Sequence, residues 1–282
     1  MLKSALQNSI LVLGLLLGAV LLGWSVGSLS SLRGVPGPTI VSSVSPVSAA
    51  ATLLILLAPA TLIAIVVGRM LNAVVGLFVL GASLAALSMQ CGTIEDLAFG
   101  GASLVATAVE SVAWAILVGV LAMIVLVGSG PLPDVPRRRG SWLAEFLDPG
   151  NTIFLAVGLV ALPVAWLVVA TPLKGQAIGG TILASAAVGF VGRLVAPRLQ
   201  PALLFAMPVL AGAAGTYIAS FNLKGGLGDA FVSGTLSRLA YPMPMDWAAG
   251  ALCGVAIGLG WARGFVKVET SGEPAMRRAI RG

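Results

Sequence analysis

The chain has 282 residues, of which 58% are hydrophobic and only 9% are charged, and its mean hydropathy is +1.05. About a quarter of the residues of a soluble domain are charged, so this chain has too few charges to cover a water-facing surface and must be solvated by lipid. The net charge of +6 fits cytoplasmic loops that meet anionic headgroups, and no basic soluble domain exists to bind nucleic acid.

Eight apolar runs are long enough to cross the hydrocarbon core of a membrane, which takes about 20 helical residues. They lack the alternation of a barrel strand, which indicates helices. We therefore predict one all-α membrane domain over 1–282, a polytopic transmembrane helix bundle of about eight spans. We expect the first span to be an uncleaved helix rather than a signal peptide. The runs lie at 10–29, 49–68, 71–90, 102–127, 152–170, 176–195, 202–220 and 247–265.

The basic residues orient these eight spans. With the N-terminus and C-terminus both cytoplasmic, twelve of the 16 Lys and Arg lie in cytoplasmic segments and four lie outside, in agreement with the positive-inside rule. The pattern predicts a bacterial-type inner membrane. The cytoplasmic residues are Lys3, Arg69, Arg137, Arg138, Arg139, Arg193, Arg198, Arg263, Lys267, Arg277, Arg278 and Arg281, and the outer ones are Arg33, Lys174, Lys224 and Arg238.

The connections differ in character. Residues 30–48 form an outer loop rich in Ser, Pro and Gly, and the outer loop 222–246 is expected to contain a short helix capped by Asp229. Either loop could re-enter the membrane. The cytoplasmic linker 131–150 carries Arg137, Arg138, Arg139 and Trp142, which we expect at the membrane surface. A basic tail follows at 266–282.

Glycines recur at every fourth residue in several spans. Such stripes remove side-chain bulk from one helix face and let neighbouring helices approach. We interpret them as packing within the chain, or as a seam for a homo-oligomer or a partner membrane subunit. The residues are Gly14 and Gly18 in the first span, Gly175 and Gly179 at the sixth, and Gly250, Gly254 and Gly258 in the last.

Glu110 is the acidic residue predicted within the membrane, and a buried carboxyl there is a functional hypothesis. It lies several residues inside the fourth span, with no charge nearby in sequence. Helical spacing places Ser103, Thr107 and Trp114 on its face. This stripe could line a cavity or relay protons, or the carboxyl could simply hold helices together.

Three prolines, Pro59, Pro163 and Pro208, fall inside predicted spans. Each removes a backbone hydrogen bond and favours a kink. A kink frees a carbonyl that could face a cavity.

Histidine is absent from the chain. This excludes His-ligated haem, His-containing zinc and iron sites, and Ser-His or Cys-His catalytic pairs. We therefore predict no metal, no cofactor and no enzymatic activity. Cys91 and Cys253 are expected at different depths, so we interpret them as small apolar fillers rather than a disulfide.

Two short segments resemble a family of membrane enzymes. Gly226-Leu227-Gly228-Asp229 resembles the GxGD signature of intramembrane aspartyl proteases, and the segment 200–204, QPALL, resembles the PAL segment of the same group. In that family the PAL segment follows the aspartate, whereas here it precedes it. A partner aspartate after a tyrosine in a preceding helix is also missing, although such chemistry needs two carboxylates that share a site.

Three functions therefore stay open from the sequence. The first is a small-solute or ion transporter or channel that uses Glu110. The second is a non-catalytic subunit or scaffold of a larger membrane complex, packed through its glycine stripes. The third, a remote one, is an intramembrane aspartyl protease that uses Asp229.

Overall fold

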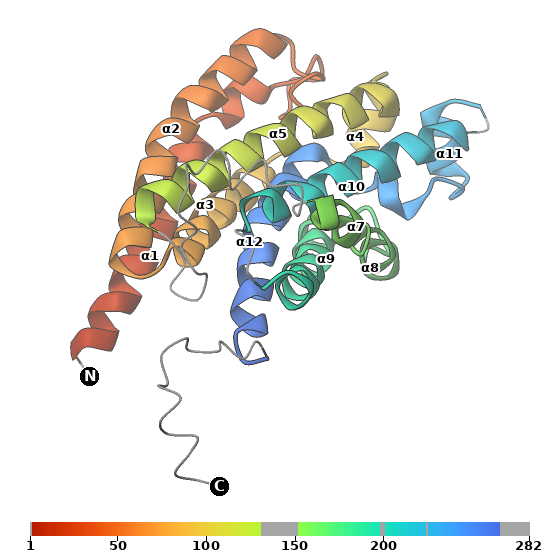
Figure 1. The fold of residues 1–282 in the computed structure, drawn as a ribbon. Helices are drawn as coiled ribbons and strands as arrows, with labels where there is room; N and C mark the ends of the chain where they lie inside the picture. Colours follow the sequence, from red (N-terminus) through yellow and green to blue (C-terminus); the bar gives the residue numbers. More distant parts are fainter. Residues whose placement is uncertain (1, 131–151, 198–200, 224, 266–282) are drawn as a thin grey trace, which may run out of the picture.

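The computed structural model describes residues 2–130, 152–197, 201–223 and 225–265, and this part of the chain is helical (Figure 1). Short helices and turns connect the long helices. In chain order the elements are α1 (Leu2–Gly23), η1 (Val26–Leu29), α2 (Pro46–Met70), α3 (Ala73–Ser88), α4 (Ile94–Phe99), α5 (Leu104–Ser129), α7 (Ile153–Gly158), α8 (Ala161–Val168), α9 (Lys174–Val195), α10 (Ala202–Phe221), α11 (Leu227–Val232), η3 (Arg238–Ala240) and α12 (Pro244–Ala262).

Among the described residues, six helices are long and apolar enough to cross a membrane: α1, α2, α5, α9, α10 and α12. Two further apolar stretches are shorter, at Ala73–Ser88 and Ile153–Val168. The fold is therefore that of a multi-pass α-helical protein. The predicted count of eight crossings and the orientation of the termini stay predictions.

The third and fifth expected spans differ from the prediction in length and continuity. The run at 71–90 forms α3, which Asn72 starts by accepting a hydrogen bond from the backbone N of Val74 at 2.9 Å. The run at 152–170 is divided into α7 and α8. Pro163 accounts for this break, because it has no N–H and its ring clashes with the carbonyl four residues earlier, at Leu159. Pro59 and Pro208, in contrast, lie inside continuous helices.

Helix α12 is the centre of the bundle. It packs against α9, α3, α10 and α5, and 83% of its apolar window is buried, against 17% for α1. The closest approach is to α9, along Gly250, Gly254 and Gly258. A Cβ added at these glycines would lie 2.6 Å from Thr181 Cβ, 2.7 Å from Ser185 Cβ and 2.6 Å from the backbone N of Phe190, respectively. Only glycine leaves room for this contact.

Helix α1 lies at the margin of the bundle, against α2 and α3 (Figure 1). Gly14 and Gly18 face these helices, where an added Cβ would lie 2.8 Å from Val67 Cγ2 and 3.0 Å from Ser83 Cβ. The opposite face exposes large apolar side chains such as Leu13 and Leu16. Exposed apolar side chains in this amount suit a lipid environment.

Helices α9 and α12 run in parallel and define two ends of the bundle. Lys174 and Asp246 lie at the start of these helices, and we call this end the charged end. Arg193 and Arg263 lie at the other end, which we call the arginine end. Arg193 lies 19 residues after Lys174, which corresponds to a rise of about 28 Å along a helix. This matches the hydrocarbon core of a bilayer, about 30 Å thick.

Short helices cover the charged end. Helices α4 and α11 pack together, with Ile94, Leu97 and Ala230 in a second hydrophobic cluster. The expected short helix in the loop 222–246 is α11, and Asp229 accepts a hydrogen bond from the backbone N of Gly226 at 3.2 Å. This bond ties the first turn of the helix.

Several sequence predictions lie outside the described residues. They concern the membrane-surface residues Arg137, Arg138, Arg139 and Trp142, the linker 131–150 that holds them, and the basic tail 266–282.

Candidate functional site

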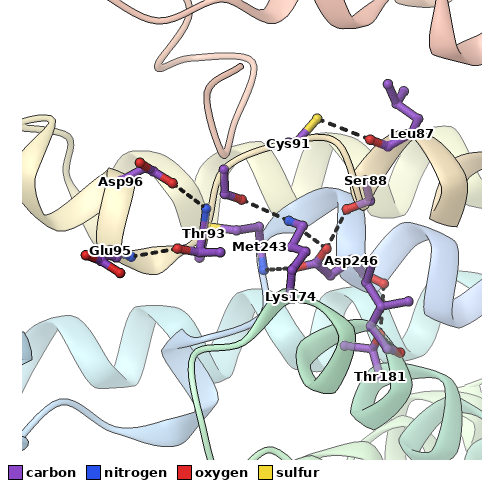
Figure 2. Close-up of polar contacts among 12 residues, drawn as sticks. Leu87, Ser88, Cys91, Thr93, Glu95, Asp96, Lys174, Thr181, Met243 and Asp246 are labelled. Atoms are coloured by element: carbon purple, nitrogen blue, oxygen red, sulfur yellow. Dashed lines mark hydrogen bonds and ion pairs between the residues drawn. The ribbon is translucent and has the colours of Figure 1, made fainter. Parts of the chain in front are cut away.

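Three helices bring polar side chains together at the charged end (Figure 2). Helix α3 ends at Ser88, α9 begins at Lys174, and α12 begins at Pro244 with Asp246 in its first turn. The negative charge of Asp246 is favourable there, because the first turn of a helix carries unpaired N–H groups and the positive end of the dipole.

Lys174 and Asp246 form a buried ion pair. The Lys174 Nζ lies 2.9 Å from the Asp246 Oδ1, and the side chains are 10% and 0% exposed. The ammonium also donates to the carbonyl O of Gly92 at 3.0 Å. An ammonium has three donors, so among the described residues one N–H of Lys174 has no protein acceptor.

The Asp246 carboxylate is fully enclosed by donors. Besides Lys174, its Oδ1 accepts a hydrogen bond from the Ser88 hydroxyl at 2.5 Å, and its Oδ2 accepts one from the backbone N of Met243 at 2.8 Å. Thr181 Oγ1 donates to the Asp246 carbonyl at 2.9 Å. Figure 2 shows these groups converging on Asp246 from three segments that are far apart in sequence. The carboxylate thus has a cation, a hydroxyl and an amide as hydrogen-bond donors.

Three further buried polar atoms lie on α9, α10 and α12. In the described part of the chain, Ser185 Oγ, Thr216 Oγ1 and Trp247 Nε1 are buried with no hydrogen-bond partner. Ser185 lies one helical turn beyond Thr181 on α9, and Thr216 lies one turn beyond Gly212 on α10, whose Cα faces the Trp247 indole. A buried polar atom without a partner costs about 1–3 kcal/mol. Such atoms mark positions where water or a polar solute would be bound.

The loop 30–45 covers the site. The backbone N of Gly92 donates to the carbonyl O of Pro36 at 3.1 Å, and Arg33 lies 3.8 Å from Asp96. In Figure 2 the pale red trace of this loop comes down toward Cys91. Gly92 therefore contacts the covering loop through its N–H and Lys174 through its carbonyl.

Glu110 holds the same loop. Its carboxylate accepts hydrogen bonds from the backbone N of Ile40 at 3.0 Å and of Val41 at 2.9 Å, and from Trp114 Nε1 at 3.3 Å. The side chain is buried, at 7% exposure. This geometry fits a carboxylate that fixes a loop to α5. Whether Glu110 also takes part in transport stays a prediction.

The predicted polar stripe on α5 is only partly assembled around Glu110. Trp114 contacts the carboxylate directly. Ser103 instead starts the helix, accepting hydrogen bonds from the backbone N of Val105 and Ala106, and Thr107 Oγ1 donates to the carbonyl of Ser103 at 3.1 Å. The two hydroxyls therefore bond to their own helix.

The thiol of Cys91 is buried and is influenced by the charges of Lys174, Asp246 and Glu110. Burial raises the pKa of its thiol from 9.0 to about 11; the Lys174 charge acts to lower this pKa, and the Asp246 and Glu110 charges act to raise it. Cys91 and Cys253 are both free and buried. Among the described residues, no group of three or more His, Cys, Asp or Glu side chains could hold a metal ion.

The ion pair of Lys174 and Asp246 is the feature of the candidate site that the sequence did not single out. Asp246 directly precedes the expected span 247–265, and Lys174 precedes the span 176–195. The sequence signal that could have identified the pair is that each of these two charged residues lies beside the predicted outer end of a span. Asp229, the residue of the protease resemblance, lies in α11 and bonds to Gly226, and Gln200 lies outside the described residues.

Comparison with protein-family models, with curated proteins and with solved structures finds no match for this chain. The class rests on the helices themselves, which suit a membrane-embedded multi-pass protein.

Proposed function

We propose that the protein is an ion transporter or channel that moves protons across the membrane, and that Lys174 and Asp246 are its charge-handling centre. The single observation that carries this proposal is the ion pair of 2.9 Å with Asp246 completely buried. Charged residues buried in a membrane bundle are costly, and they mark substrate and ion pathways, proton relays and voltage sensors; this pair lies at the end of the bundle, where such a pathway would open.

Stability alone does not account for the pair. Replacing a buried ion pair by well-packed apolar side chains is often neutral or stabilising, whereas removal of one partner costs about 3–5 kcal/mol. A chain with only 9% charged residues would lose little by having two leucines there. This comparison supports a role for the pair that apolar side chains could not fill.

The proposed step uses the groups around the pair. In this step protonation of Asp246 removes the attraction that holds Lys174, and the lysine, whose side chain is 10% exposed, turns its ammonium to an incoming acceptor. Among the buried polar atoms without a partner, Ser185 Oγ lies on α9 between Lys174 and Arg193 and supports a route that continues toward the arginine end. The covering loop, held by Glu110 and Gly92, closes the site on the other side.

A proton-flux measurement tests this proposal. Purified protein is reconstituted in liposomes loaded with a pH-sensitive dye, and a potassium gradient with valinomycin sets the membrane potential. We expect proton flux above that of protein-free liposomes and its reduction by at least tenfold in Asp246→Asn. Glu95→Gln is the matched control, because Glu95 is an exposed carboxylate at the same end. Absence of flux in the unmodified protein, or equal flux in Asp246→Asn, would overturn the proposal.

One observation favours the alternative of a subunit in a larger membrane complex. At Gly175 and Gly179 an added Cβ meets no other atom within 4 Å. Small residues four apart on an open helix face suit a second helix from a partner or another copy of the chain.

A further inference from the structure

The loop 30–45 is a self-contained unit. Its two ends are joined by a hydrogen bond of 2.9 Å from the backbone N of Val44 to the carbonyl O of Ser30. A second bond, of 2.8 Å, runs from the backbone N of Gly37 to the carbonyl O of Leu29. Compact loops with close ends are Ω-loops, which are packed by their own side chains and frequently carry function. The loop can therefore move as one body about its two ends.

Hydrogen bonds rather than a hydrophobic seal hold this loop on the bundle. Of its five Val, Leu and Ile side chains, Ile40 packs against the hydrophobic core. The other four are exposed: Leu32, Val35, Val41 and Val44. Segments with few buried apolar contacts open at low free energy, and lids and binding loops are drawn from them. The loop is thus a part of the fold that can open while the helices stay packed.

Glu110 provides the strongest polar attachment of the loop. Its carboxylate accepts hydrogen bonds from the backbone N of Ile40 at 3.0 Å and of Val41 at 2.9 Å. Hydrogen bonds to a charged acceptor are about twice as strong as those between neutral groups. The contact of 3.8 Å between Arg33 and Asp96 is solvent-exposed and adds little. Lifting the loop takes both N–H groups away from Glu110, so this carboxylate determines how readily the loop lifts.

Gly92 connects the loop to the buried ion pair. Its N–H donates to the carbonyl O of Pro36 in the loop at 3.1 Å, and its carbonyl O accepts a hydrogen bond from Lys174 Nζ at 3.0 Å. Lys174 is in turn the partner of Asp246. A movement of Pro36 away from Gly92 therefore acts directly on the segment that holds the lysine.

We propose that the loop 30–45 is a gate over the ion pair, latched by Glu110 and opened by movement of the whole loop away from Gly92. The gate rests on the proposed transport function, because it admits protons or ions to the pair from the charged end. The structure shows the closed state, in which the side chains of Lys174 and Asp246 are 10% and 0% exposed. In a fixed cover, by contrast, the loss of one attachment would leave the others in place.

Hydrogen–deuterium exchange of the full chain in detergent, resolved to single residues by electron-transfer dissociation, distinguishes a gate from a fixed cover. Glu110→Gln keeps the shape of the side chain but replaces one acceptor oxygen by an NH₂ donor. For a gate, we expect exchange at least tenfold faster at Ile40, Val41 and Gly92 together, although the N–H of Gly92 is bonded to Pro36 and not to Glu110. Faster exchange at Ile40 and Val41 alone would show a fixed cover and overturn the gate.

Two controls show whether the change is confined to the loop. Glu95→Gln removes an exposed carboxylate at the same end and should leave all three rates unchanged. The backbone N of Met243 donates to Asp246 Oδ2 at 2.8 Å and should exchange in Glu110→Gln as it does in the unmodified protein. Faster exchange at Met243 would mean that Glu110 stabilises the whole charged end, which would also overturn the gate.

Alkylation of Cys91 measures access to the space beneath the loop in variants that change no charge. The residue is 7% exposed and directly precedes the glycine that contacts the loop. In a Cys253→Ala background, Ile40→Ala removes the apolar contact of the loop with the core. We expect this variant to accelerate the reaction with a small maleimide at least fivefold. Val41→Ala, the matched control with an exposed side chain, should leave the rate unchanged, and equal rates in the two variants would overturn the gate.

Cys253 distinguishes opening of the gate from loosening of the bundle. It lies in α12 and is 3% exposed. In a Cys91→Ser background, its alkylation should proceed at the same rate with and without Ile40→Ala. A faster reaction at Cys253 would mean that the variant loosens the helices rather than the loop, against the gate. Neither readout is proton flux, so failure of the gate is distinguishable from failure of the transport proposal.

Discussion

Cys91 is a built-in reporter of the charges on Lys174 and Asp246. The thiol is buried beside both groups, and its pKa of about 11 responds to them with opposite sign. The thiolate is the reactive form of cysteine. The rate of alkylation at a fixed pH therefore measures how easily Cys91 loses its proton within the folded protein.

We expect alkylation of Cys91 by a small maleimide to accelerate with pH up to about 11, rather than to level off near the ordinary value of 9.0. At pH 8, Lys174→Met should slow the reaction, because it removes the cation that lowers the thiol pKa. Asp246→Asn should accelerate it, because it removes an anion that raises this pKa. Mass spectrometry in a Cys253→Ala background follows Cys91 alone, and a change of both variants in the same direction would contradict the assigned charges.

The raised pKa of Cys91 makes the folded protein less stable as the pH rises above 9. The unfolded thiol ionises near pH 9.0 and the folded thiol near 11, so the unfolded state loses its proton first. The thiol's contribution to stability is constant below pH 9 and changes in favour of the unfolded state as pH rises from 9 to 11.

Helices α9 and α12 depend on glycine for their contact. Gly254 faces Ser185, whereas Gly260, six residues later on the same helix, faces open space. We expect Gly254→Ala to lower the free energy of unfolding by about 1–3 kcal/mol, the usual cost of overpacking. Gly260→Ala should be neutral or stabilising, because alanine favours the helix by up to about 1 kcal/mol.

Thermal unfolding in detergent, followed by tryptophan fluorescence, compares these two variants. Both make the same chemical change in the same helix, so the difference between them isolates the helix contact from helix propensity. Equal unfolding temperatures for the two variants would show that α12 does not need Gly254 to pack against α9.

Composition and run length were sufficient to predict helices. In a membrane, an apolar run of about 20 residues has few other ways to satisfy its backbone hydrogen bonds. The break between α7 and α8 depends on whether neighbouring helices hold a proline kink straight, as they do at Pro208 but not at Pro163. The sequence therefore predicted a kink at each proline but not whether the helix would be interrupted there. Packing against neighbouring helices decides this, and the local sequence does not show it.

The candidate site was harder to predict than the spans. Asp246 and Lys174 are 72 residues apart in the printed numbering, and only the parallel packing of α9 and α12 brings them together. Glu110 stood out because it lies within one apolar run, but its partners are backbone N–H groups of Ile40 and Val41. Every residue has such groups, so the sequence carries no signal for this contact.

At the scale of the whole molecule, α3 links the two ends of the bundle. Its last residue, Ser88, bonds to Asp246 at the charged end, and Asn72, which caps its start, lines a cavity at the arginine end together with Arg193 and Arg263. Its 16 residues rise only about 24 Å. A membrane thins locally around a short span at modest cost, so this length still permits a crossing.

We therefore expect α3 to cross the membrane, as the eight-span topology requires. Met70 and Gln90 flank the helix and are both exposed. In a Cys91→Ser, Cys253→Ala background, Met70→Cys and Gln90→Cys should react with a membrane-impermeant maleimide from opposite sides. With the N-terminus inside, intact spheroplasts label Gln90→Cys at once and Met70→Cys only after permeabilisation. Labelling of both cysteines from one side would show that α3 does not cross the membrane. The linker 131–150 with its three arginines would then lie on the outer side, against the positive-inside rule.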